Sequence, residues 1–413
     1  MRIERTDSGV TRREIRPGVE EEVRSILEEV RAGGDEAVLR LTERFDKAEL
    51  GPEQLRVDAR ELEGSVGVLE PEVLSGLRTA IANVRAVVKA QAREPVEVDL
   101  DQGQHLEIVE VPVGRAAIYV PGGRAPYPST VVMGAVTARV AGVDEIVVCA
   151  PPGPGGRAHP VILAACMLCE VSEVYRMGGA QAIAALAYGT TSVRSVDVIA
   201  GPGNAWVQEA KRQLAFTHVG IDGVAGPSEL AVIVEGTGVD PEAVALDLLA
   251  QAEHGADSPL WLFAPDDEVR EAILAAVERL APARPTVADA RLEVCAAGGE
   301  GALWMVEGLA PEHLQLVGEE AERLAPRVRR AGCVFVGAGA GTAFGDYVAG
   351  SNHILPTGGA ARFQSALSAA TFRRRMARVS LPDGAPGRLA PAGAALARAE
   401  GFPVHAESME RRA

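Results

Sequence analysis

Positive charge is scarce in this sequence. Its 413 residues include only three lysines, and 41 basic residues stand against 57 acidic ones, which gives a net charge of −16 and a pI near 5.0. A surface of this sign repels nucleic-acid phosphates and anionic lipids, so it lacks the electrostatic attraction on which non-specific binding to either depends. The composition therefore indicates no nucleic acid and no membrane among the partners, and it favours a small molecule.

Long apolar segments are lacking as well. No stretch approaches the length needed to cross a bilayer, and the first residues lack a basic segment followed by an apolar one, which a secretory leader would show. The five cysteines are odd in number, and Cys149, Cys166 and Cys333 stand in apolar surroundings, as reduced and buried thiols do. Cys166 and Cys169 form a Cys-x-x-Cys, but no second pair accompanies them, so a zinc or redox role is the weaker interpretation. We expect a cytoplasmic protein.

The hydrophobic pattern indicates an α/β protein of two or more domains. Hydrophobic residues make up 47% of the chain and charged residues 24%, which is enough for sizeable buried cores. Helical spacing predicts one helix over Val19–Arg31, a second that Asp35 caps, and a third over Pro71–Arg93. A Pro- and Gly-rich linker is expected over Leu381–Gly393, before a last helix.

Strand and helix patterns alternate through the rest of the chain. Continuous apolar strands separated by helices are typical of parallel sheets that are covered on both faces, and their number predicts two sheet domains. The expected strands are Glu107–Val111, Ala116–Val120, Ile146–Cys149, Val196–Ala200, Leu230–Val234, Leu260–Phe263, Leu303–Val306 and Cys333–Val336.

Three glycine-rich turns follow expected strands and open expected helices. They are Tyr119–Gly123, Met177–Gln181 and Gly201–Asn204, each at the carboxyl end of a parallel strand, where such sheets bind ligands. Glycine lets the backbone approach a pyrophosphate, and the following helix offers unpaired N–H groups. None of the turns has the Gly-x-Gly-x-x-Gly fingerprint, there is no Walker A sequence, and no lysine stands where a phosphate-binding loop would need one. Nucleotide binding and ordinary tight turns both stay open.

Four of the seven histidines lie in four short polar runs, which are Gln251–His254, Pro311–Leu314, Gly345–His353 and Glu400–His405. In the first, Gln251 and His254 are three residues apart before Gly255, so they share one face near the end of a helix. Asp346 and His405 could complete a mixed nitrogen and oxygen ligand set suited to zinc, although no spacing shows that they converge. A solvated helix end is the alternative for Gln251 and His254.

The adjacent pair Glu312-His313 differs from the other runs. Pro311 before it and Leu314 after it indicate a helix start that is exposed at a sheet edge. A histidine there can take a proton from an alcohol while the carboxylate activates water, provided that both reach a substrate carbon. A capping glutamate beside a satisfied histidine is the alternative.

Taken together, these strings resemble the histidinol dehydrogenase family, whose zinc enzymes end histidine biosynthesis. The resemblance covers almost the whole length and depends on many long motifs in one order. They are Gly114–Gly123, Gly178–Thr190, Gly201–Asn204, Gly226–Glu229, Gln251–Gly255, Leu309–Leu314, Gly345–Tyr347 and Gly350–His353.

The resemblance implies a fold of two incomplete Rossmann-like parallel-sheet domains, with small N- and C-terminal helical segments, in an interlocked homodimer. It places a terminal segment at 1–17, a zinc and substrate domain at 18–118 plus 229–367, an NAD-binding domain at 119–228 and a dimerisation arm at 368–413.

The resemblance also implies the site residues. One zinc per subunit would be bound by Gln251, His254, Asp346 and His405, and the catalytic pair would be Glu312 and His313. The remaining positions are substrate contacts at Ser228, His353 and Glu400, besides the metal ligands and His313, and NAD contacts at Tyr119, Gln181 and Asn204. Glu400 and His405 would reach across from the partner subunit.

The implied reaction oxidises L-histidinol through L-histidinal to L-histidine, with two NAD reduced. We hypothesise that zinc holds the imidazole and amine of the substrate, that His313 removes the hydroxyl proton, and that Glu312 helps water to add to the aldehyde. A paralogue that oxidises another polar alcohol, such as a sulfonated diol, is one alternative, although the presence of Glu400 and His405 favours the imidazole substrate. A zinc hydrolase and a non-catalytic ligand-binding protein are the others.

Overall fold

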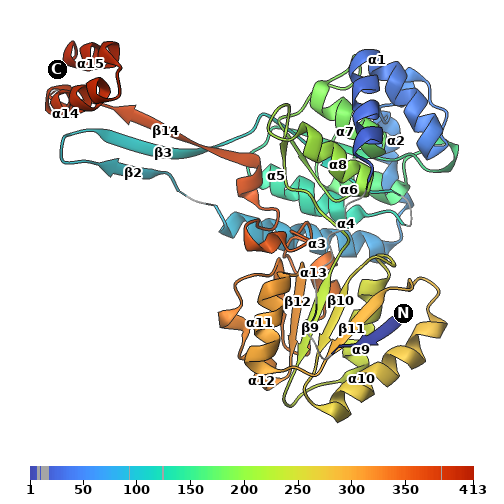
Figure 1. Ribbon diagram of the computed structural model, residues 1–413. Helices are drawn as coiled ribbons and strands as arrows, with labels where there is room; N and C mark the ends of the chain where they lie inside the picture. The colour runs from blue at the N-terminus through green and yellow to red at the C-terminus, as the bar shows by residue number, and fades with distance from the viewer. Residues whose placement is uncertain (7–9, 11–17, 93, 123–124, 383) are drawn as a thin grey trace. The chain divides into compact units, whose positions relative to one another are not determined.

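A computed structural model describes residues 1–6, 10, 18–92, 94–122, 125–382 and 384–413. The chain forms two compact units, of which the larger comprises Met1–Ala90 and Gly114–Phe372 and the smaller Gln91–Val113 and Arg373–Ala413. The larger unit contains a five-stranded and a six-stranded sheet, and the smaller one a three-stranded sheet with two helices (Figure 1). Within the described ranges, no helix is both long enough and apolar enough to cross a bilayer.

The five-stranded sheet is parallel throughout and has the order β6-β5-β4-β7-β8. From β4 the chain proceeds outward to β5 and β6, and it then returns to the other side of β4 for β7, so the strand order reverses between β4 and β7. In parallel sheets this reversal opens a crevice at the carboxyl ends of the strands. The strands are β4 (Arg115–Tyr119), β5 (Glu145–Ala150), β6 (Glu173–Arg176), β7 (Val198–Ala200) and β8 (Gly220–Ile221).

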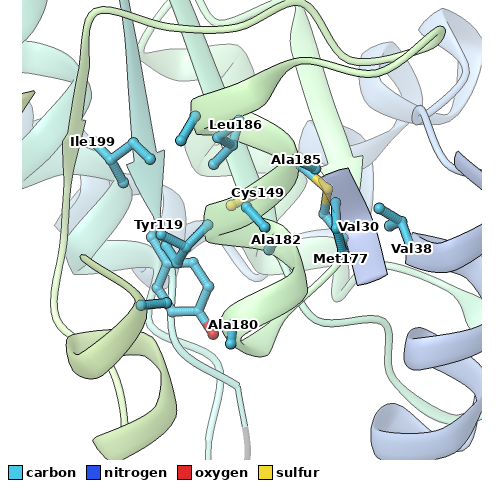
Figure 2. Close-up of a cluster of buried hydrophobic side chains, with 14 of the residues drawn as sticks. Val30, Val38, Tyr119, Cys149, Met177, Ala180, Ala182, Ala185, Leu186 and Ile199 are labelled. Carbon is cyan, nitrogen blue, oxygen red and sulfur yellow. The ribbon is translucent and has the colours of Figure 1, made fainter. Parts of the chain in front are cut away.

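Helices cover both faces of this sheet (Figure 1). On one face, α1 (Glu20–Asp46), α7 (Gly179–Tyr188) and α8 (Ala205–Leu214) share a core with the strands. Figure 2 shows this core, in which Val30 and Val38 of α1 approach α7 while Tyr119 and Cys149 come from the strands. The helices toward the other face are α2 (Ala59–Gly64), α3 (Pro71–Ala90), α4 (Pro128–Val131), the π-helical η3 (Val132–Val136), α5 (Thr137–Val140) and α6 (Pro160–Leu168).

The six-stranded sheet is also parallel, with the order β1-β11-β10-β9-β12-β13, and it reverses between β9 and β12. Its strands are β1 (Arg2–Arg5), β9 (Leu230–Val234), β10 (Leu260–Phe263), β11 (Arg291–Cys295), β12 (His313–Val317) and β13 (Cys333–Val336). The parallel sheets and the alternation of strand and helix confirm the expected fold class.

Helices cover both faces of the six-stranded sheet too, which explains why its central strands are apolar at every position. Leu230 and Val232 share a core with α9 (Pro241–Ala252) and α10 (Asp267–Leu280), whereas Ala231 and Ile233 face α11 (Gly299–Leu309) and α12 (Glu319–Glu322). Both sheets fall within one compact unit, and α1 shares its core with the five-stranded sheet. The domain boundaries stay predictions.

The smaller unit contains an antiparallel sheet of order β14-β3-β2, formed by β2 (Val96–Asp99), β3 (His105–Pro112) and β14 (Arg373–Ser380). Two helices follow, α14 (Ala385–Ala399) and α15 (Pro403–Glu410), and they contact each other through Ala394, Ala397 and Ala406.

Some expectations about individual elements were wrong. Leu303–Val306 lies in α11 and is not a strand, because Leu303 and Val306 are buried one helical turn apart while Trp304 between them is 77% exposed. The expected linker over Leu381–Gly393 is helical from Ala385 onward: Pro386 lies in the first turn, where proline is tolerated, and the helix continues through Pro391 in its interior.

Three further expectations differ from the structure, and they concern the N-terminal segment, Asp35 and the adjacent pair Glu312-His313. Residues Arg2–Arg5 form an edge strand on β11, where a helical segment was expected, and most of the rest of the segment 1–17 lies outside the described residues. Asp35 does not cap a helix but accepts hydrogen bonds from the backbone and hydroxyl of Ser192. His313 opens the buried strand β12, so the expected exposed helix start at this pair was also wrong.

Candidate active site

A chain of polar groups lies at the amino ends of β9 and β12. These strands are neighbours, and Leu230 pairs with His313, so the residues just before each strand come together. The hydroxyl of Ser228 donates to Glu312 Oε2 at 2.6 Å, and the backbone N–H of Glu229 donates to the same oxygen at 2.9 Å. The site is therefore at the opposite end of the sheet from the one at which parallel sheets commonly bind ligands.

Glu312 is a buried carboxyl group, with only 6% of its surface exposed. Burial raises its pKa above the ordinary value, although the hydrogen bonds from Ser228 and Glu229 and the neighbouring His313 oppose the shift. Because burial disfavours the ionised form, this carboxylate accepts a proton more readily than an exposed glutamate does. Such a group is suited to act as a general base toward water.

The geometry around His313 defines which ring nitrogen is free. Its Nδ1 lies 3.0 Å from the backbone oxygen of Glu229, and because a carbonyl can only accept, Nδ1 carries the proton. The Nδ1 atom is 3.6 Å from Glu312 Oε2, too far for a second good hydrogen bond. In the neutral form of the ring Nε2 is therefore the nitrogen without a proton, and it lies 3.7 Å from Asp346 Oδ1. This tautomer presents a base toward Asp346.

Asp346 belongs to α13 (Thr342–Tyr347), and His353 follows in the next turn. Nδ1 of His353 donates to the backbone oxygen of Asp346 at 2.8 Å, and Nε2 lies 3.3 Å from the hydroxyl of Thr130. Burial lowers the pKa of His353, and His313 and His254 act in the same direction, while Asp346 opposes them. The ring is therefore neutral at physiological pH, and three other candidate residues lie near enough to act on it.

Asn352, next to His353, joins this site to the helices of the five-stranded sheet. Its amide nitrogen donates to the backbone oxygen of Met133 at 3.1 Å, within the π-helical turn η3. Turns of this kind leave carbonyl groups available to partners outside the helix and occur often at functional sites. The contact fixes the segment that carries His353 against the five-stranded part of the unit.

Gln251 and His254 lie at the end of α9, which Asp240 caps as its sequence predicts. Gln251 is buried, and its amide nitrogen donates to Ser228 Oγ at 2.8 Å, so the hydrogen bonds run from Gln251 through Ser228 to Glu312. His254 follows two residues after the helix end and is exposed. An amide oxygen, an imidazole nitrogen and the Asp346 carboxylate are donors that zinc accepts.

Glu400 and His405 are the two expected site residues that belong to the smaller unit. Glu400 ends α14 and His405 lies in α15, where its ring stacks on Phe402 at a centroid distance of 5.2 Å. Both side chains are exposed. Among the described residues, no group of three or more His, Cys, Asp or Glu side chains is arranged to hold a metal ion. The expected set differs from such a group because it includes a glutamine and a residue of the smaller unit.

The three expected NAD contacts lie at the carboxyl end of the five-stranded sheet. The phenol oxygen of Tyr119, at the end of β4, accepts the backbone N–H of Gly179 at 3.1 Å. Gln181 is buried in the first turn of α7, and Asn204 caps α8 by accepting the N–H of Val207 at 3.1 Å. The three turns expected to bind a ligand thus lie at one end of the sheet, where the reversal of strand order commonly provides a ligand site, although Gly123 of the first lies outside the described residues.

A side chain could not replace the hydrogen of Gly201 at this end of the sheet. Its φ is +129°, and a Cβ atom would lie 2.1 Å from the backbone oxygen of Tyr119. The close approach of the turn after β7 to the end of β4 therefore requires glycine.

Two acidic residues that lie at these sites were not predicted from the sequence. Glu229 is buried, and its carboxylate accepts the N–H of Gly358 at 3.0 Å and that of Glu312 at 3.3 Å. Asp46 ends α1 and accepts from the amide of Gln181 at 3.3 Å. The position of Glu229 directly after Ser228 could have indicated it, whereas Asp46 is 135 residues from Gln181 and no local pattern connects them.

The chain matches known proteins along almost its whole length. A family model described as histidinol dehydrogenase matches residues 11–413. The chain is 42% identical over 401 residues to histidinol dehydrogenase of Gluconobacter oxydans, covering 95% of this chain and 93% of that protein. It is 43% identical over 408 residues to that of Cereibacter sphaeroides, covering 97% and 93%. The crystal structure of histidinol dehydrogenase from Elizabethkingia anophelis superposes with a TM-score of 0.92 at 31% identity, covering 100% of this chain and 98% of the other.

The burial of Asp46 predicts a pH-dependent stability effect. Burial raises the pKa of Asp46 from 3.8 to about 6. Between these two pH values the carboxyl group is ionised in the unfolded chain but still protonated in the folded protein, so the free energy of unfolding falls as the pH rises from 3.8 to about 6. Asp46→Asn keeps an acceptor for Gln181 without the charge, and we expect it to raise the free energy of unfolding at neutral pH by about 1–3 kcal/mol. Urea unfolding should show this gain shrinking as the pH falls from 6 toward 3.8. Glu43→Gln, on the exposed surface of α1, is the control and should show no such trend.

Proposed function

The chain belongs to the histidinol dehydrogenase family of NAD-dependent oxidoreductases, and from that premise we propose that it oxidises L-histidinol to L-histidine through L-histidinal, in the cytoplasm, with reduction of two NAD. The observation that carries the proposal is the connected series Gln251, Ser228, Glu312, His313 and Asp346 at the amino ends of β9 and β12. It brings a buried carboxyl group and an imidazole of defined tautomer beside donors that suit a metal ion.

We assign the cofactors to separate parts of the larger unit. Gln251, His254 and Asp346 would hold one zinc ion together with His405 of the partner subunit, and the ion would supply a Lewis acid that polarises and orients the amino alcohol. The crevice formed by Tyr119, Gln181 and Asn204 would hold NAD, which accepts hydride. The donor set and the glycine-lined crevice fit these two groups.

His313 acts as the base in both oxidations. Its Nε2 takes the proton of the substrate hydroxyl as hydride leaves the carbinol carbon, and in the second oxidation it takes a hydroxyl proton of the aldehyde hydrate. The resulting imidazolium is stabilised because Nδ1–H donates to the backbone oxygen of Glu229 at 3.0 Å. Ser228 and His353 would contact the substrate, and so would Glu400 of the partner subunit.

Glu312 acts between the two oxidations. Its carboxylate takes a proton from water as the water oxygen adds to the carbonyl carbon of L-histidinal, which gives the hydrate. Burial, which raises the pKa of Glu312, increases its proton affinity, and the hydrogen bonds from Ser228 and Glu229 hold the carboxylate in one orientation. Retaining the reactive aldehyde at the site until it is oxidised prevents side reactions.

The smaller unit supports a homodimer in which Glu400 and His405 serve the partner's site. Directly paired residues put an apolar row on one face of its sheet, formed by Val96, Val98, Leu106, Ile108, Ala377 and Val379. Four of these side chains, Val96, Val98, Ile108 and Val379, are exposed in the single chain. An apolar face of this size is normally covered, and a second copy of the chain is the partner that we propose.

A steady-state assay tests the function directly. L-Histidinol with NAD should give NADH absorbance, and a chelator of divalent ions should abolish the activity until zinc is restored, because the alcohol then loses its Lewis acid. NAD reduction with a sulfonated diol but not with L-histidinol would instead indicate a paralogous dehydrogenase. Hydrolysis without NAD reduction would overturn the proposal.

The division of roles between Glu312 and His313 predicts different variant phenotypes. Glu312→Gln lacks the base for hydration, so we expect oxidation of added L-histidinal to fall by about 10²–10⁴-fold. His313→Asn should slow oxidation of both L-histidinol and L-histidinal, since His313 serves both steps. Single-turnover NADH formation from each substrate measures the two effects. A Glu312→Gln enzyme that oxidises L-histidinal at the normal rate and fails on L-histidinol would contradict these roles.

Shared sites predict complementation between inactive variants. His405→Ala and His313→Ala should each be inactive, but in a mixed dimer one site combines the intact His313 of one chain with the intact His405 of the other. Random exchange should restore about a quarter of wild-type activity, because half of the dimers are mixed and one of their two sites works. Glu312→Gln mixed with His313→Ala is the control without recovery, as both residues serve one chain's site. Inactive mixed dimers, isolated by two affinity tags, would contradict the exchange of arms.

A further inference from the structure

Lys211, one of only three lysines in the chain, is buried beside a glycine-rich turn. It lies on α8, its side chain is 1% exposed, and its ammonium group donates to the backbone oxygen of Gly201 at 3.0 Å. No lysine was expected at a phosphate-binding position from the sequence. In the fold, the ammonium group of Lys211 lies beside the turn that precedes α8. A buried ammonium group requires a partner, and Asp222, whose side chain is 6% exposed, forms an ion pair with it.

The pair holds Gly201 from both sides. While Lys211 binds the carbonyl oxygen of Gly201, Asp222 Oδ2 accepts its N–H at 2.8 Å. These two groups belong to the peptide units before and after the Cα atom, so the pair restrains both at a φ of +129°. The turn Gly201–Asn204 is thereby fixed at the place where the strand order reverses.

Asp222 also connects this turn with the segment that carries His353. Its backbone oxygen accepts the amide of Gln364 at 2.7 Å. Gln364 lies within a loop that begins at His353 and is closed by the hydrogen bond from Leu367 N to Ile354 O at 2.9 Å. One residue therefore contacts both the turn expected to bind NAD and the loop that follows a residue expected to bind substrate.

The free energy of folding does not by itself explain why a charged pair stands at this position. Desolvating two ions costs several kcal/mol each, and apolar replacements of similar volume often leave stability unchanged. Lys211 also cannot serve as an ordinary phosphate ligand, because its ammonium group is covered and neutralised by Asp222. What the pair provides is two directed hydrogen bonds to one glycine.

We propose that Lys211 and Asp222 are positioning residues that hold the Gly201–Asn204 turn in the conformation that binds NAD. This inference rests on the proposed function. The pair acts through the backbone of Gly201, so its loss should weaken the binding of the dinucleotide and not the binding of the alcohol substrate.

Lys211→Met combined with Asp222→Leu tests the proposal, because the double variant removes both hydrogen bonds to Gly201 and leaves no unpaired buried charge. We expect the KM for NAD to rise about tenfold or more, while kcat and the KM for L-histidinol change less than about twofold. The Kd of NADH, from fluorescence titration, should rise in parallel. Arg115→Met combined with Glu173→Gln is the matched control, since it removes a buried ion pair from the amino end of β4 in the same sheet. It should lower stability without raising the KM or the Kd.

The outcomes separate this inference from the proposed function. A folded double variant with wild-type NADH affinity would overturn the inference, and so would an equal loss of affinity in the control. Wild-type protein that binds no NADH would overturn the proposed function instead. If the double variant does not fold, Gln364→Ala removes only the hydrogen bond to Asp222 O, and it should raise the Kd of NADH severalfold with unchanged thermal stability. An unchanged Kd there would contradict the inference.

Discussion

The pairing of β9 with β12 is the constraint on which the active site depends. It sets His313 beside Leu230, so the backbone oxygen of Glu229 meets Nδ1 of the imidazole and the backbone N–H of Glu229 meets the Glu312 carboxylate. Backbone groups thus define both the tautomer of His313 and the orientation of the Glu312 carboxylate. A shift of one residue in this register would turn His313 to the other face of the sheet and separate all of these partners.

The two parallel sheets repeat one strand order but use opposite ends. The five-stranded sheet offers the carboxyl ends of β4 and β7, where Gly201 approaches the backbone of Tyr119. In the six-stranded sheet the equivalent end is closed by the protein itself, because the Glu235 carboxylate accepts the N–H of Gly299 at 2.5 Å, at the start of α11. A helix start that already binds a carboxylate is not available to a phosphate. The residues that we propose as catalytic lie instead at the amino ends of β9 and β12.

Some of the buried charged groups in the larger unit hold backbone turns in place. Lys211 and Asp222 hold the turn at Gly201, and Glu229 accepts from the backbone of Gly358. Each of these groups would cost free energy if it lost its partner. The sites therefore depend on hydrogen bonds that stabilise particular conformations of loops, in addition to the apolar cores that stabilise the sheets.

The sequence alone determined the parallel α/β class, most strands and the positions of the glycine-rich turns. Continuous apolar runs indicate buried strands, and glycine indicates turns that other residues cannot adopt, so both can be recognised from a short stretch of sequence. Leu260–Phe263 and Cys333–Val336 are strands with the expected bounds, whereas Leu303–Val306 is helical, since a run of four apolar residues fits either structure. The resemblance of its motifs indicated the family.

Only the tertiary structure decided which polar groups meet. It placed Glu312 and His313 in a buried strand, Lys211 beside Gly201, and Asp46 against Gln181. These contacts join residues that are far apart in the chain or depend on how a helix is oriented, and the hydrogen bonds and desolvation that result depend on distance in space. No local pattern of residues encodes that distance.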